Sequence, residues 1–77
     1  MAERIYFWDF FGPRAEGTAI HFVVHLDEFL AREGLDGCTT GRASQGRGHH
    51  AATCRAPERH WPALERALRP KRWEDGV

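Results

Sequence analysis

The sequence lacks a long apolar run and has no net charge. No stretch approaches the ~20 consecutive apolar residues of a membrane-spanning helix, so the sequence predicts no membrane partner. Basic and acidic side chains number eleven each, and without a net positive charge we expect no nucleic-acid partner. The first residues also lack a signal-peptide pattern, which predicts a cytoplasmic protein.

Cysteine is scarce, and the motifs of familiar cofactor sites are absent. We expect the two cysteines to be free thiols in the cytoplasm. No G-x-G-x-x-G sequence occurs, and the glycine-rich segment 41–48 leads into two histidines instead of the Gly-Lys-Ser/Thr of a phosphate-binding loop. The side chains with zinc-binding atoms are Cys38, His49, His50 and Cys54. Their spacing is not that of the paired ligands in zinc sites, and no catalytic signature surrounds either cysteine, so we expect no metal, no cofactor and no enzyme.

Aromatic side chains, in contrast, are concentrated near the beginning of the chain. Residues 5–11 hold five of them in seven positions, and successive side chains of a strand point to opposite faces. One face carries Tyr6, Trp8 and Phe10, and the other carries Ile5, Phe7, Asp9 and Phe11. We expect the uniformly aromatic first set to face the core. The other face then presents aromatics to solvent, and an exposed apolar patch usually marks a partner.

The next segment has the pattern of an amphipathic helix from Thr18 to Glu33. Thr18 is a residue type that caps helix N-termini, and Gly34 stands where helices often end in a left-handed glycine. The apolar stripe at helical spacing is Ala19, Phe22, Val23, Leu26, Phe29 and Leu30. On the opposite side, His21 and His25 have a spacing that lets two imidazoles share a metal. Two ligands alone do not make a site, so we interpret them as part of a solvated face.

Segments 38–43 and 49–55 flank a glycine-bearing loop and predict a β-hairpin. A hairpin centred on Gly46 places Cys38 directly opposite Cys54. A disulfide is then geometrically feasible, although we expect free thiols.

The last helix is predicted from Trp61 to Leu68, after a turn at residues 58–60. Its buried stripe consists of Trp61, Leu64 and Leu68. Pro70 ends it, because proline cannot continue a helix. Residues 71–74 either add a short edge strand or pack as a tail.

The elements follow the order β-α-β-β-α, which predicts a single α+β domain over residues 1–77. A right-handed crossover sets the second strand parallel to the first, and the hairpin then brings the third strand beside the first. We expect a small mixed sheet in the order 2-3-1, with both helices on one face and a short fourth edge strand if the tail joins. This looks like three quarters of a ferredoxin-like (split βαβ) fold.

The chain also resembles small bacterial proteins of unassigned function. The resemblance is carried by residues 6–17, Thr18-Ala19, residues 25–30 and Leu68-Arg69-Pro70. It implies no activity, cofactor or site.

The sequence therefore predicts a non-enzymatic interaction or regulatory module that binds an unidentified protein partner through its aromatic sheet. The alternative is a protein that holds a small anion or a metal near the hairpin. The candidate binding residues are Tyr6 and Trp8 on the sheet, and Arg42, Arg47, His49 and His50 on the hairpin.

Self-association through the first strand is also predicted. The first 41 residues carry three basic and seven acidic side chains, and the remainder carries eight basic and four acidic ones. We expect facing elements of one chain to neutralise each other, and the opposite charges are also compatible with attraction between two copies. In the order 2-3-1 the first strand is an unpaired edge, and apolar edges invite pairing. We expect a homodimer, unless the tail covers this edge and places Trp73 over the aromatic cluster.

Overall fold

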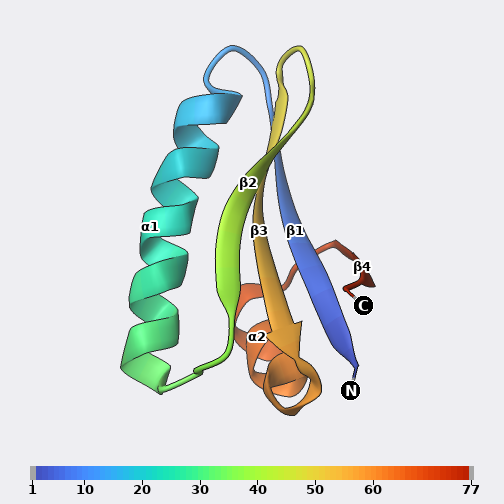
Figure 1. The fold of residues 1–77 in the computed structure, drawn as a ribbon. Helices are drawn as coiled ribbons and strands as arrows, with labels where there is room; N and C mark the ends of the chain where they lie inside the picture. The colour runs from blue at the N-terminus through green and yellow to red at the C-terminus, as the bar shows by residue number, and fades with distance from the viewer. Residues whose placement is uncertain (1, 77) are drawn as a thin grey trace.

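The structure, a computed structural model, describes residues 2–76 of the chain. One four-stranded sheet in the order β2-β3-β1-β4 packs two helices on one face (Figure 1). The strands are β1 (Glu3–Phe11), β2 (Thr39–Gly46), β3 (His49–Pro57) and β4 (Arg72–Asp75), and the helices are α1 (Ala15–Glu33), the 3₁₀ turn η1 (Glu58–His60) and α2 (Trp61–Leu68). The α+β class, the 2-3-1 order and the bounds of the last helix are confirmed.

The tail forms the fourth strand, and it lies beside the N-terminal half of β1 (Figure 1). β4 pairs with the segment Arg4–Phe7, so half of the β1 edge is covered. The tail therefore covers this part of the edge, which is one of the two predicted alternatives, and the homodimer stays a prediction. β1 and β2 run in the same direction, but β3 lies between them, so every neighbouring pair is antiparallel and the sheet is not mixed.

Helix α1 begins at Ala15, three residues earlier than predicted. The Ala15 N–H donates to the Gly12 carbonyl oxygen (3.1 Å), and the Thr18 N–H donates to the Arg14 carbonyl oxygen (3.0 Å). Thr18 is therefore inside the first turn and is not the N-cap, because a backbone turn before the helix already supplies the first acceptor. The predicted end is confirmed, since Gly34 adopts a left-handed conformation with φ of 66°.

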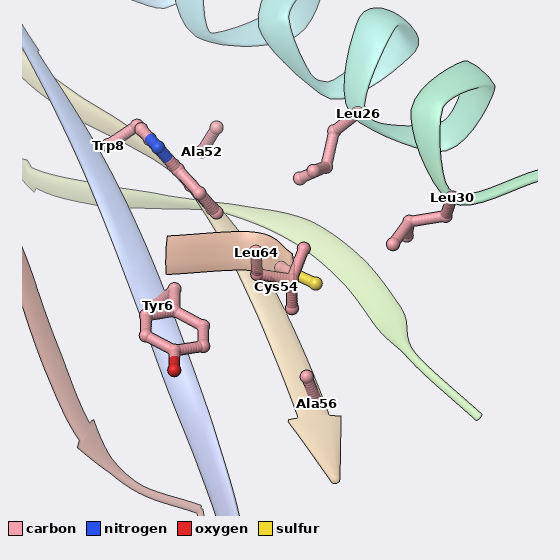
Figure 2. Packing of buried hydrophobic residues seen from close by; sticks show 8 residues of the cluster. All are labelled: Tyr6, Trp8, Leu26, Leu30, Ala52, Cys54, Ala56 and Leu64. Carbon is pink, nitrogen blue, oxygen red and sulfur yellow. The ribbon is translucent and has the colours of Figure 1, made fainter. Parts of the chain in front are cut away.

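The core lies between the helices and the aromatic face of β1, as predicted (Figure 2). Its buried members are Tyr6, Trp8, Leu26, Leu30, Ala52, Cys54, Ala56 and Leu64. The other predicted core residues pack against them with partial exposure: Phe10, Phe22, Val23, Phe29, Trp61 and Leu68. Small side chains on β3 leave room for the two large rings of β1. The Trp8 indole N–H is satisfied, because it donates to the Leu68 carbonyl oxygen (2.9 Å).

The hairpin has a different register from the predicted one. A two-residue turn, Arg47-Gly48, connects the strands, and Thr40 instead of Cys38 lies opposite Cys54. The turn lies later than the predicted centre at Gly46, and by itself it would place Gly41 opposite Cys54; a bulge between Ser44 and Gly46 moves the partner back to Thr40. Both cysteines are free thiols. Burial raises the pKa of the Cys54 thiol to about 12.

Arg4 joins β1, α2 and β4. Its guanidinium carbon lies 3.9 Å from the centre of the Trp61 ring and 3.8 Å from that of the Trp73 ring, so the cation is held between two indoles. Its Nη1 donates to Glu65 Oε2 at 2.7 Å. The Trp73 ring thus packs on Arg4 and remains partly exposed.

Candidate interaction surface

The second face of the sheet, which we call the helix-free face, carries the other half of the β1 side chains. Strand alternation turns them away from the core aromatics. From β1 these residues are Ile5, Phe7, Asp9 and Phe11. Their cross-strand neighbours on β3 are Arg55, Thr53, Ala51 and His49. Cross-strand neighbours share a face, so this surface spans the two central strands.

A side chain from the tail covers the middle of the helix-free face. The guanidinium carbon of Arg72 lies 4.0 Å from the centre of the Phe7 ring, and Phe7 is only 7% exposed. Arg72 is fixed there by Asp9, because its Nε donates to Oδ2 and its Nη2 donates to Oδ1, both at 2.9 Å. The expectation of a wholly exposed aromatic face is therefore wrong at Phe7.

Phe11 remains open at the end of the same row. It is 73% exposed, and its ring stacks on His49 with centroids 4.3 Å apart. The His49 Nε2–H donates to Asp9 Oδ1 at 2.8 Å. Asp9 therefore holds Arg72 on one side and His49 on the other, and this arrangement presents the Phe11 ring in a defined orientation.

The carboxylate of Asp9 makes the fold acid-sensitive. Hydrogen bonds from Arg72, together with His49, lower its pKa from 3.8 to about 2. Because the folded value lies below the unfolded one, the stabilisation is complete above about pH 4 and is lost as the pH falls towards about 2. Asp9→Asn should lower the free energy of unfolding by about 1–3 kcal/mol at neutral pH and flatten the profile over this acidic window. Urea unfolding at several pH values measures both effects. If the wild type and Asp9→Asn lost the same free energy of unfolding as the pH falls, Asp9 would not be the source of the acid sensitivity.

The outer edge of β1 is open next to Phe11. β4 pairs only with Arg4–Phe7, so in the described part of the chain no strand pairs with Trp8–Phe11 on that side. Unpaired main-chain groups on a strand edge are a template for another extended chain. Exposed aromatic surface and free edge thus meet at one end of β1.

Two of the predicted binding residues are not on any surface. Tyr6 and Trp8 lie in the core under the helices, because their side of β1 is the one that α1 and α2 cover. They cannot offer their rings to a partner. The Tyr6 hydroxyl instead donates to Glu65 Oε2 at 2.5 Å, and burial is the main cause that raises the pKa of Tyr6 to about 12.

The four hairpin residues are not brought together. Arg42 and His50 lie on the helix side, where with Ser44 they line a hollow of about 310 Å³. His49 points to the helix-free face, because neighbouring side chains on a strand alternate, and Arg47 is exposed in the turn. Arg42 in the hollow also faces Glu16, with Nη1 and Oε2 3.7 Å apart.

The structure does not bring His50 and Cys54 together as a base and a nucleophile. His50 and Cys54 are four residues apart on β3, which is about 13 Å along a strand. The high pKa of the buried Cys54 thiol keeps it protonated near neutrality. Among residues 2–76, no group of three histidine, cysteine or acidic side chains has a metal-binding arrangement.

Sequence reasoning did not single out Arg72 or the pairing of Asp9 with His49. The available signal was the tail strand: once residues 72–75 pair with β1, Arg72 falls opposite Phe7 and shares its face. Asp9 was noted only as a charge within an apolar strand, and such a charge needs a partner.

No protein-family model, curated protein or solved structure matches this chain. The resemblance to small bacterial proteins stays a prediction. Within residues 2–76, neither helix has the length and apolarity that a membrane crossing requires.

Proposed function

We propose that this protein is a non-enzymatic interaction module whose binding surface is the Phe11 end of the helix-free face. The observation that carries the proposal is the large exposure of Phe11 beside an unpaired strand edge. Large exposed aromatics on small domains are typical of contact surfaces. The ion-pair network beneath Phe11 holds this surface in place before any partner arrives, which lowers the entropic cost of binding.

The partner that fits is an extended, apolar segment of another protein. Main-chain donors and acceptors along Trp8–Phe11 favour an added strand. A side chain of that strand then packs on the Phe11 ring. Because β4 ends the free edge at Phe7, the added strand is short, and the aromatic contact has to supply much of the affinity. Stacking of two copies through this face is the homodimeric version of the same proposal.

The element order and the strand order support a ferredoxin-like arrangement, with β4 as the fourth strand. We include this assignment in the proposal. The alternative function, anion binding near Arg42 and His50, has the hollow in its favour. Glu16 already faces Arg42 there, so an anion has to compete with a carboxylate, and we place this function second.

Phe11→Glu is the variant that tests the proposed surface. We expect it to fold like the wild type, since Phe11 is mostly exposed, and to lose at least tenfold in affinity for a partner that wild-type protein captures. The captured partner is purified and titrated into isotope-labelled protein. Amide resonances of residues 8–11 and 49–51 should shift.

The matched control is Ile20→Glu, which places the same charge on an exposed apolar position of α1. It should bind the partner like the wild type in metal-free buffer. Equal binding by the Phe11 variant, or shifts confined to the helices, would refute this surface as the binding site.

A further inference from the structure

The outward face of α1 carries two exposed apolar side chains. Ile20 is 45% exposed and Val24 is 50% exposed, and they are one helical turn apart. They lie on a different side of α1 from the buried residues Leu26 and Leu30. This face is separate from the helix-free face of the sheet, because α1 packs on the other side.

His21 and His25 lie beside these apolar residues with their Nε2 atoms 2.8 Å apart. Zinc–nitrogen bonds of about 2.0–2.1 Å at a tetrahedral angle place two ligand nitrogens about 3.3 Å apart. A shift of half an ångström between two exposed rings therefore allows both to bind one ion. In the absence of metal, one Nε2 donates a hydrogen to the other.

Glu28 prepares His25 for this role. Its Oε1 lies 3.4 Å from His25 Nδ1, which favours a proton on Nδ1 and a free lone pair on Nε2. A carboxylate on the second ring nitrogen is a recurrent feature of histidines that bind zinc. Arg32 does not oppose the ion directly, because its Nε lies 3.5 Å from Glu33 Oε2 and its guanidinium carbon lies 5.7 Å from the Phe29 ring centre.

The site is incomplete in one chain. A closed zinc site takes four ligands, and the described residues offer no third side chain in reach of His21 and His25. A second copy related by a twofold axis supplies the same two histidines and completes a tetrahedral set. The same contact covers Ile20 and Val24 of both copies.

Charge explains why the ion is needed. α1 carries four acidic side chains and one basic one, so two such helices repel each other when they approach. A divalent cation between them offsets this repulsion and draws the two apolar faces together.

We propose that two copies pair through α1 across a zinc ion bound by His21 and His25 of each chain. Protein stripped of metal with a chelator should have the mass of one chain by light scattering at micromolar concentration. Added Zn²⁺ should double this mass, with the change complete at one ion per two chains. The Phe11→Glu variant should respond like the wild type, so the outcome is independent of the proposed function.

Three variants test the contact. His21→Ala and His25→Ala should keep the single-chain mass at all zinc levels, and Val24→Asp should weaken the zinc-induced doubling at least tenfold. These residues are exposed, so circular dichroism should show an unchanged fold. His50→Ala, which removes a histidine from β3 and leaves α1 unchanged, is the matched control and should dimerise with zinc.

The outcomes that overturn the proposal are specific. They are zinc binding without a change of mass, a dimer that persists with chelator, and zinc-induced dimers in the two α1 histidine variants or in Val24→Asp.

Discussion

Leu64→Ala should lower the free energy of unfolding by about 2–5 kcal/mol, the usual range for a buried leucine truncated to alanine. Leu64 is fully buried and is the only buried residue of α2, so its loss leaves a cavity against β1 and β3 that no other side chain of that helix fills (Figure 2). In a domain of this size each kcal/mol corresponds to roughly 4–8 °C in Tm. A loss of more than about 10 °C is therefore expected in a thermal melt.

Ile20→Ala is the matched control for this experiment. It removes a similar volume from an exposed position of α1, and in metal-free buffer it should change stability by no more than about 0.5 kcal/mol. Comparable losses in the two variants would mean that α2 does not hold the core through Leu64.

Removal of residues 71–77 should make the protein self-associate. The truncation takes away β4 and uncovers the edge of β1 at Arg4–Phe7, and it also removes Arg72 from the Phe7 ring. A long apolar edge without a cover pairs readily with other chains. Light scattering should show a mass that rises with concentration, and the amides of Arg4–Phe7 that bond to β4 should exchange faster.

The variant Arg72→Met, made without truncation, distinguishes the effect of losing the β4 strand from the effect of losing the ion pair. It keeps the main chain of β4 but loses the bond to Asp9, and we expect it to retain the mass of the wild type. If the truncated chain had this mass too, the tail would not be what protects the edge.

The parts of the fold that follow from local pattern were predictable. The stripe that includes Leu26 and Leu30 has helical spacing, and Gly34 ends the helix. The bounds of α1 were therefore predicted correctly except for its first residues. Trp61 to Leu68 is likewise a short amphipathic run between a turn and a proline. The order 2-3-1 was predicted from the crossover together with the hairpin, which brings the third strand beside the first.

The parts that depend on long-range pairing were not predictable. A strand that is apolar on both faces does not reveal which side chain a distant arginine will cover, and Phe7 is buried by a residue 65 positions further along. The register that sets Thr40 opposite Cys54 depends on the turn at Arg47-Gly48 and on a bulge in β2, and a segment of small residues gives no clear signal for either. The candidate surface was therefore expected at Tyr6 and Trp8, which lie in the core, while the exposed aromatic of the same strand is Phe11.

The position of β1 in the sheet has a consequence for synthesis on the ribosome. β1 is made first, yet both of its neighbours, β3 and β4, come from the second half of the chain. Between Phe11 and Asp75 lie 64 residues of synthesis, which take about 3–13 s at roughly 5–20 residues per second.

Until β3 has been made, α1 is the element that can shield the new strand. Its Phe22 reaches Trp8 and Phe10, with ring centres 5.2 and 5.7 Å apart, but it covers one face alone. Phe7 stays uncovered longest, because Arg72, which lies over its ring, is among the last residues to be made. The nascent chain is therefore most exposed to misassembly through a side chain that the finished protein buries.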